Sequence, residues 1–212
     1  PSYGGDNGSQ KYSTLDQINA SNVNRLESAW TWDSVDNATV ANNIANDNAR
    51  AAPAGYKATP IVVGDTMYVP TSFGRIVALD AISGVEKWVF DTRAWEAGRP
   101  TNLGYNTRGV AYWEEDGEER IFFATNDSSL WSIDVDSGQP DTNFGDNGRI
   151  DLSLGLGREI DKSQYGVVSP PLVTNNRVVV NSIVLDGGRS KEMPPGHVRA
   201  FNPITGELEW MF

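Results

Sequence analysis

The chain has 212 residues, 39% of them hydrophobic, and a net charge of −11. This charge argues against nucleic-acid binding through a basic surface, and no apolar run approaches the length of a membrane span. The absence of cysteine excludes disulfides and thiolate metal sites, and the single histidine, His197, excludes a multi-histidine metal site. The 21 glycines and 11 prolines indicate many turns and few long helices.

The first 56 residues carry weak structural signals. A capping box from Thr14 to Gln17 predicts the start of a short helix, and residues 26–32, with Trp30 and Trp32, predict a strand. Residues 33–56 are rich in asparagine and alanine, which predicts a long loop.

The rest of the chain predicts three groups of antiparallel strands of propeller-blade size. The first group covers residues 57–90 and includes a hairpin about Gly64-Asp65. The second covers residues 108–140 and ends in a weak strand near Gln139, and the third covers residues 167–212. Long insertions separate the groups.

A repeated phrase ties the three groups together. It reads DAISGVEKW at residues 80–88, returns as DVDSG at 134–138 without a tryptophan, and returns complete as NPITGELEW at 202–210. An Asp or Asn side chain favours a turn by bonding the backbone two residues on, and glycine takes a positive φ without steric cost. The tryptophan that follows is well placed to dock on a neighbouring module. The repeat therefore favours radially stacked sheets over three ordinary hairpins in a sandwich.

These features predict an all-β fold of the β-propeller type, with about three blades and one orphan strand within residues 1–212. In this interpretation residues 1–32 supply an N-terminal segment and a strand that completes the last blade. Propellers close with four to eight blades, so we expect the chain to be the N-terminal part of a longer single propeller domain.

Several stretches, in order along the chain, resemble the quinoprotein dehydrogenases that depend on pyrroloquinoline quinone (PQQ), in particular the membrane glucose and alcohol dehydrogenases. The 80–88 phrase is similar to the family's tryptophan-docking motif. The other matching stretches are YGGD at 3–6, YSTLDQIN at 12–19, RGVAYW at 108–113, FGDNG at 144–148, SPP at 169–171 and PGHVRAF at 195–201.

The resemblance implies an eight-bladed propeller with PQQ and Ca²⁺ on its axis. It implies a periplasmic or otherwise extracytoplasmic oxidoreductase that oxidises an alcohol, polyol or aldose sugar by hydride transfer to the quinone, with Ca²⁺ as a Lewis acid. A quinone or a cytochrome c would accept the electrons. The family's catalytic base lies in later blades, so the resemblance places no catalytic residue in this segment, which alone would be inactive and would need the remainder of the propeller as its partner.

The resemblance also suggests cofactor-binding residues. Arg108 matches an arginine that contacts a PQQ carboxylate, and a guanidinium fork suits carboxylate recognition. Asn106 and Thr107 lie beside it and are expected to donate to the same ligand. Ser169, next to Val168, matches a stretch that brings a hydroxyl near the quinone. The alternative for Arg108 is a surface arginine in a loop.

One metal ligand and two departures from the family pattern complete the set. Asp186 falls where the family places an acidic Ca²⁺ ligand, although a turn formed with Gly187 is an equal alternative. Lys57 stands where relatives often carry glutamate, and as a cation it would pair with a PQQ carboxylate. Trp113 replaces a functional histidine of the membrane glucose dehydrogenase, which weighs against glucose as the substrate.

Two other functions fit the repeats. One is a non-catalytic propeller scaffold that binds protein partners, similar to the outer-membrane assembly lipoproteins. The other is an incomplete propeller that closes its ring by associating with another chain. The Arg108 motif and FGDNG at 144–148 favour the enzyme, because a scaffold requires neither.

Overall fold

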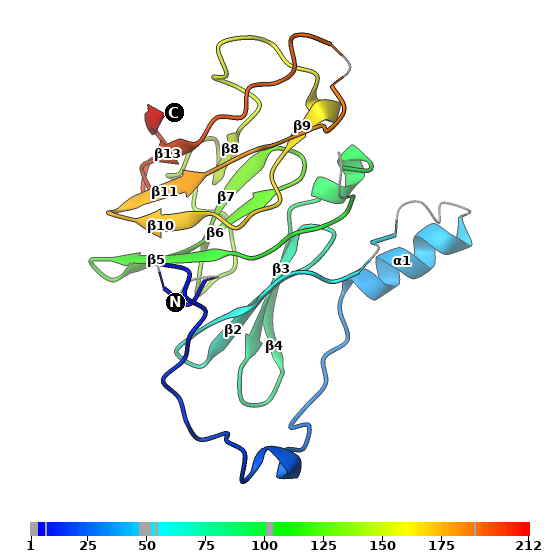
Figure 1. Cartoon of the computed structure of the whole chain (residues 1–212), viewed down its shortest axis with the longest axis vertical. Helices are drawn as coiled ribbons and strands as arrows, with labels where there is room; N and C mark the ends of the chain where they lie inside the picture. The colour runs from blue at the N-terminus through cyan, green and yellow to red at the C-terminus, as the bar shows by residue number, and fades with distance from the viewer. Residues whose placement is uncertain (1–3, 7, 47–51, 54, 101–103, 189) are drawn as a thin grey trace.

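The computed structural model describes residues 4–6, 8–46, 52–53, 55–100, 104–188 and 190–212. Three four-stranded antiparallel sheets and one two-stranded ribbon follow one another along the chain (Figure 1). Each four-stranded sheet begins in one of the three predicted blade regions, and we refer to the sheets as blades 1, 2 and 3.

Blade 1 forms as the sequence predicts. Its strands are β1 (Ile61–Val63), β2 (Thr66–Pro70), β3 (Arg75–Asp80) and β4 (Glu86–Asp91), paired in that order. The hairpin about Gly64-Asp65 places Val63 opposite Thr66, which confirms that prediction.

Blade 2 departs from the prediction at its fourth strand. It consists of β5 (Ala111–Glu115), β6 (Glu118–Thr125), β7 (Ser129–Asp134) and β8 (Arg149–Asp151). The weak strand expected near Gln139 is wrong, because this region makes only an isolated bridge between Ile133 and Pro140. A loop then carries the chain to β8, which pairs with β7.

Blade 3 contains an interruption that the sequence does not predict. Its strands are β10 (Leu172–Thr174), β11 (Arg177–Val180), β13 (Arg199–Phe201) and β14 (Leu208–Met211). Between β11 and β13 the chain leaves the blade, and β12 (Ile183–Val184) pairs with β9 (Tyr165–Gly166) as a separate ribbon.

The repeated phrase forms the same turn in each blade. Asp80 Oδ1 accepts hydrogen bonds from the Ser83 amide at 2.8 Å and its hydroxyl at 2.7 Å. Asp134 accepts the same pair from Ser137, and Asn202 accepts from the Thr205 amide at 3.0 Å. The glycine of each turn has a φ near +70°, as the sequence predicts: 73° at Gly84, 67° at Gly138 and 74° at Gly206.

Tryptophan rings dock on two of these turns, one from the N-terminal segment and one from blade 1. The ring of Trp30 lies against Gly84, and its Nε1 donates to the Ala81 carbonyl at 3.3 Å. The ring of Trp88 lies against Gly138, and its Nε1 donates to the Val135 carbonyl at 2.9 Å. Blade 2 has no tryptophan in its phrase.

The glycine of the third turn has a different neighbour. Backbone atoms of Gly145 lie against Gly206, and the Gly145 amide donates to the Thr205 carbonyl at 3.0 Å. The loop before β8 therefore replaces the missing tryptophan ring.

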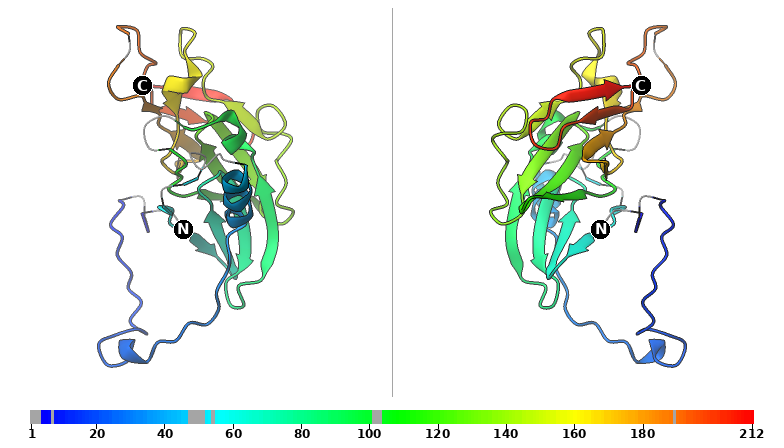
Figure 2. Two further views of the ribbon diagram at one scale, coloured as in Figure 1. Left: turned by 90° about the vertical axis from the view of Figure 1, so that its right-hand side faces the viewer. Right: turned by 90° about the vertical axis from the view of Figure 1, so that its left-hand side faces the viewer.

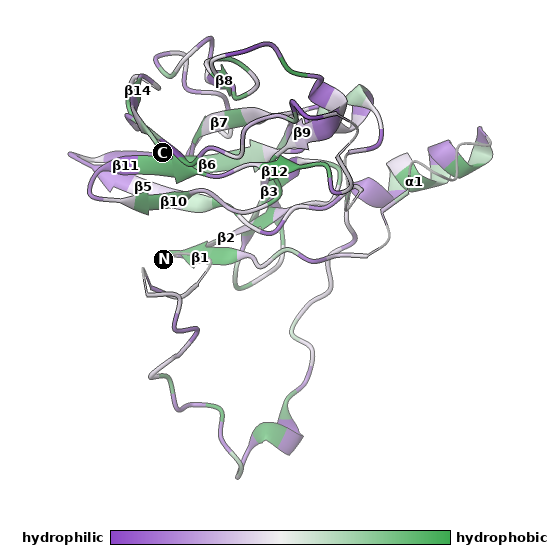
Figure 3. Ribbon diagram, turned by 45° about the horizontal axis from the view of Figure 1, so that its top comes forward, coloured by the Kyte–Doolittle hydropathy of each residue, from purple (hydrophilic) through white to green (hydrophobic). Residues whose placement is uncertain are grey.

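The core lies between the blades. Ile121 and Phe123 on β6 face a cluster shared with blade 1, whereas Phe122 faces a cluster shared with blade 3. All three side chains are fully buried, because alternate residues of a strand point to opposite faces. Hydrophobic residues accordingly gather on the strands (Figure 3).

The N-terminal region differs most from expectation. The described residues before Trp32 contain no strand and only a 3-10 turn at Val23–Arg25, so neither the strand expected at residues 26–32 nor the helix expected from Thr14 forms. This segment runs away from the blades in both views of Figure 2. The predicted loop 33–56 instead contains helix α1 (Asp36–Ala45). Short 3-10 helices also form at Ala94–Ala97 and Lys162–Gln164. The described helices are too short or too polar to cross a membrane.

Candidate functional site

A short segment leads into the first strand of each blade: residues 57–60 before β1, 105–110 before β5 and 167–171 before β10. We term these the lead-in segments. Because neighbouring strands run in opposite directions, the lead-in segments lie at the end of the blades opposite the repeated turns. Lys57, Arg108 and Ser169 occupy similar places in them, each three or four residues before its strand.

The segment 106–108 is held by three hydrogen bonds from distant parts of the chain. The Thr59 amide donates to the Arg108 carbonyl at 2.9 Å, which joins the first two lead-in segments. The Thr107 hydroxyl donates to the Thr71 carbonyl at 2.8 Å, and the Asn126 side chain donates to the Asn106 carbonyl at 3.0 Å. Asn106 and Thr107 are buried while Arg108 is exposed, so a fixed backbone carries an exposed guanidinium.

Asn106 contributes a second polar feature. Within the described part of the chain, its buried side-chain oxygen accepts no hydrogen bond. Buried polar atoms nearly always have a partner, and a donor on a bound ligand would supply one. The exposed guanidinium of Arg108 and the buried acceptor two residues earlier suit a ligand that carries carboxylates and a hydrogen-bond donor, as PQQ does.

The remaining candidates have different surroundings. The Thr107 proton is already committed to Thr71, so this hydroxyl holds the backbone in place and has no proton left to donate to a ligand. Ser169 is half-buried next to the buried Val168, and Lys57 is exposed.

Asp186 lies on the segment that follows β12. The preceding residue, Leu185, donates its amide to the Gln164 carbonyl at 2.9 Å, and β12 pairs with β9, so this segment is tied to the chain that leads into β10. The Asp186 side chain is exposed. No group of three or more histidine, cysteine, aspartate or glutamate residues forms a metal site among the residues that the structure describes.

An aromatic contact packs the second lead-in segment against blade 1. Phe73 and Tyr105 stack edge to face with centroids 4.9 Å apart. Burial raises the pKa of the Tyr105 phenol, against the opposing charge of Arg99. Tyr105 therefore serves as a neutral packing group beside Asn106.

Sequence reasoning missed Asn126. This residue follows β6, where the chain reverses at the same end as the lead-in segments, and its backbone oxygen lies against Gly166 on the way into β10. Asn126 therefore contacts the second lead-in segment and β9, which directly precedes the third. A turn after the second strand of a blade must lie at this end, so the order of the strands alone could have placed Asn126 near the lead-in segments.

Trp113 occupies a structural position. Its side chain is buried in β5, and its Nε1 donates to Asn176 Oδ1 at 2.7 Å. The ring also lies 5.7 Å from the Arg120 guanidinium carbon. These contacts make Trp113 part of the packing between blades 2 and 3.

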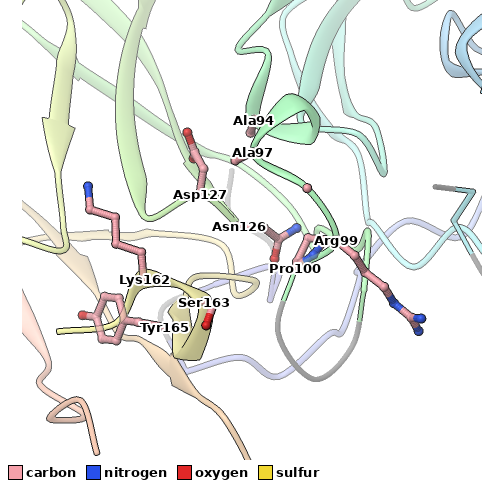
Figure 4. A pocket seen from close by; sticks show the side chains of 10 residues that line it. Ala94, Ala97, Arg99, Pro100, Asn126, Asp127, Lys162, Ser163 and Tyr165 are labelled. Carbon is pink, nitrogen blue, oxygen red and sulfur yellow. The ribbon is translucent and has the colours of Figure 1, made fainter. Parts of the chain in front are cut away.

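A small cavity lies beside Asn126. Its volume is about 190 Å³, below the roughly 300 Å³ at which ligand pockets begin. Figure 4 shows side chains from three separate segments around it, with Arg99 pointing away from Lys162. The described residues that line it do not include Lys57, Arg108 or Ser169, so it is separate from the candidate cofactor segment. Its polar lining residues are Arg99, Asn126, Asp127, Lys162, Ser163 and Tyr165.

Comparison with known proteins identifies the family to which this architecture is similar. The family model for PQQ, described as "Glucose/ethanol/alcohol dehydrogenase, beta-propeller domain", matches residues 1–212. The quinate/shikimate dehydrogenase (quinone) of Acinetobacter baylyi is 31% identical over 99% of this chain, and the quinoprotein glucose dehydrogenase of Gluconobacter oxydans is 32% identical over 99%. This chain spans only 27% and 26% of their respective lengths.

A solved structure agrees. The quinohemoprotein alcohol dehydrogenase of Comamonas testosteroni superposes on 100% of this chain with a TM-score of 0.72 and 25% identity, and the match covers 26% of that protein. The all-β fold is thus part of a β-propeller. The chain belongs to the PQQ-dependent glucose, ethanol and alcohol dehydrogenase β-propeller family.

Proposed function

We propose that the protein containing this chain is an extracytoplasmic, PQQ- and Ca²⁺-dependent dehydrogenase of an alcohol, polyol or aldose sugar. In this proposal residues 1–212 form the first part of one propeller domain, and blades beyond them close the ring and supply the catalytic base. A quinone or a cytochrome c would accept the electrons. Family membership supports this function over a scaffold role.

The observation that carries the proposal is the presentation of Arg108. Its backbone is fixed by bonds to two neighbouring segments, while its side chain is exposed. A guanidinium recognises a carboxylate with two parallel hydrogen bonds, and with the backbone already fixed only the Arg108 side chain has to become ordered on binding.

The other residues would complete one wall of the cofactor site. Lys57 would add a second cation, Asn106 would accept a hydrogen bond, and Ser169 would offer a hydroxyl. When bound, PQQ supplies the quinone that takes a hydride from the substrate. The residues named here bind and orient that group, and none of them is proposed to move a proton.

Calcium forms a separate part of the proposal. A carboxylate suits Ca²⁺, and Asp186 lies on a segment tied to the lead-in to β10. Because the described residues contain no cluster of three candidate ligands, we propose that Asp186 is one ligand and that the other ligands come from elsewhere in the intact protein.

The decisive experiment measures PQQ affinity in the intact protein. Arg108→Ala should weaken binding about tenfold or more, because it removes a charge-assisted bidentate contact. The PQQ affinity of Arg108→Lys should lie between those of the wild type and Arg108→Ala, since lysine keeps the charge but cannot form two parallel hydrogen bonds. Arg25→Ala, which removes an exposed charge from the N-terminal segment, is the control. Unchanged affinity in Arg108→Ala would remove this residue from the site.

Calcium dependence is tested in the same way. Asp186→Ala should raise the Ca²⁺ concentration needed for PQQ retention, whereas Asp136→Ala, an exposed carboxylate in a repeated turn, should not. An unchanged calcium titration in Asp186→Ala would assign Asp186 to the turn with Gly187.

A further inference from the structure

We infer that Asp36 and Arg75, far from Arg108 in the sequence, are positioning residues for the candidate cofactor segment. They fix the turn at residues 71–74, and that turn holds Thr107 and Tyr105 and thereby sets the position of Arg108. This inference rests on the proposed function of Arg108.

The first step is the capture of the 71–74 turn by helix α1. Asp36, in the first turn of the helix, is buried, and both of its carboxylate oxygens are used. One oxygen accepts from the Thr71 hydroxyl at 2.9 Å, and the other accepts from the Phe73 amide at 3.0 Å. A carboxylate with charge-assisted bonds to two residues of one tight turn fixes the shape of that turn.

Arg75 completes this anchor. Its guanidinium donates to Asp36 at 2.7 Å, to Thr39 at 2.9 Å and to Asp91, at the end of β4, at 2.9 Å. The group lies 5.8 Å from the centre of the Trp95 ring. Arg75 is buried, so these bonds are shielded from solvent and tie the helix to blade 1.

The second step runs from the turn to the site. The Thr71 carbonyl accepts the Thr107 hydroxyl at 2.8 Å, and the Phe73 ring packs edge to face on Tyr105. Thr71 and Phe73, the two turn residues that Asp36 binds, are therefore also the two that contact the second lead-in segment. Arg108 follows Thr107 directly, so a shift of the turn displaces its backbone.

This arrangement gives helix α1 a role that its own sequence does not suggest. The segment from residue 33 to residue 46 acts as a brace against the site end of blade 1. Loss of the Asp36 charge should loosen the brace without removing any group that touches the cofactor. The expected result is weaker PQQ binding through a mispositioned Arg108.

The chain offers a matched control. Arg120 and Asp141 form another buried ion pair at 2.7 Å, and Arg120 also pairs with Glu118, as Arg75 also pairs with Asp91. Among the residues that the structure describes, Arg120 and Asp141 form no hydrogen bond or ion pair with segment 105–108. Asp36→Asn and Asp141→Asn thus remove one carboxylate charge from each of two buried arginine–aspartate pairs, one connected to the site and one not.

The test measures PQQ affinity of the intact protein, well below its unfolding temperature. Asp36→Asn should weaken binding about tenfold, while Asp141→Asn should change it less than about twofold. If Asp36 acts through Arg108, the effects of Asp36→Asn and Arg108→Ala should be non-additive in the double variant. Equal effects of Asp36→Asn and Asp141→Asn, or additive effects with Arg108→Ala, would overturn the inference.

A readout without the cofactor separates positioning from binding. Hydrogen exchange of residues 105–110 in the cofactor-free protein should be faster in Asp36→Asn and unchanged in Asp141→Asn. Thr107→Val, which keeps the side-chain shape and removes the bond to Thr71, should reproduce both effects if Asp36→Asn fails to fold. Unchanged exchange in these variants would also overturn the inference. If Arg108→Ala leaves PQQ affinity unchanged, the proposed function fails instead.

Discussion

The two ends of the blades are held together by different kinds of contact. At one end, the repeated turns close through bonds that span two or three residues, such as those from Ser83 to Asp80. At the other end, the lead-in segments are held by bonds across 36 residues, from Thr107 to Thr71, and 20 residues, from Asn126 to Asn106. Local bonds fix the shape of each turn before a tryptophan ring or the Gly145 amide docks on it, whereas the backbone at Asn106 and Thr107 is fixed by distant bonds.

The largest loss of stability is expected at the repeated turn of blade 2, where Gly138 lies against the Trp88 ring. A Cβ at Gly138 would lie 2.5 Å from the Trp88 ring, at a φ of +67°. Gly138→Ala should therefore lower the free energy of unfolding by about 3 kcal/mol, from steric overlap plus left-handed strain. Gly117→Ala is the control, because it has a φ of +83° with open space around it, and should cost about 1 kcal/mol. If chemical denaturation shows equal losses of unfolding free energy in the two variants, contact with the Trp88 ring contributes nothing to the cost of Gly138→Ala.

The second prediction tests the site end in the same way. A Cβ at Gly166 would lie 2.8 Å from the Asn126 backbone oxygen, and no positive φ is involved. Gly166→Ala should lower stability by about 2 kcal/mol and should also weaken PQQ binding, because it displaces the turn that holds Asn106. Gly196→Ala, in open space, should do neither. Destabilisation with intact PQQ affinity would contradict the dependence of the site on distant contacts.

A third change removes one distant bond alone. Asn126→Ala deletes the donor to the Asn106 carbonyl and should cost about 1 kcal/mol of stability together with a measurable loss of PQQ affinity. Asn143→Ala, at an exposed asparagine in the loop before β8, serves as the control in both assays. If the two variants behave alike, the Asn126 bond does not hold the segment.

The smallest effect is electrostatic and lies at the repeated turn. Hydrogen bonds from the Ser83 hydroxyl and amide hold the pKa of Asp80 below its ordinary value. Ser83→Ala should raise that pKa while the amide bonds remain, as measured by NMR titration of the carboxyl group.

The sign of the pH dependence follows from the direction of this shift. The folded-state pKa lies below the unfolded value, so the stabilisation is present above the unfolded pKa of about 4 and is lost as the pH falls through the folded pKa. The stability difference between wild type and Ser83→Ala should therefore shrink in acid. A difference that does not change with pH would show that the hydroxyl bond does not favour the charged carboxylate.

The same contrast explains which features could be predicted. The three Asp/Asn turns were readable because the side-chain bonds that shape them lie within the phrase. The expected strand at residues 26–32 did not form, because apolar residues alone do not make a strand without a pairing partner. Helix α1 was missed because its sequence is polar and its first turn is fixed by Arg75, 39 residues away.

The candidate site was only partly accessible in advance. Arg108 came from a resemblance, and its role in binding the cofactor stays a prediction, because an exposed side chain also suits a surface arginine in a loop. Asn126 was missed, and Thr107 was expected to donate to a ligand although its hydroxyl bonds Thr71, because bonds between blades leave no local pattern. Strand β8 was missed for a similar reason, since a loop that packs on Gly206 takes the place of the absent tryptophan.

The direction of the ring contacts has a consequence for synthesis. Trp30 donates to a carbonyl 51 residues further along the chain, and Trp88 to one 47 residues further along. Each ring therefore finds its partner only after about 50 more residues have left the ribosome. Blades should accordingly become stably packed one after another during synthesis, each when the next blade has been made. Translation from the N-terminus therefore helps to set the order in which the blades assemble.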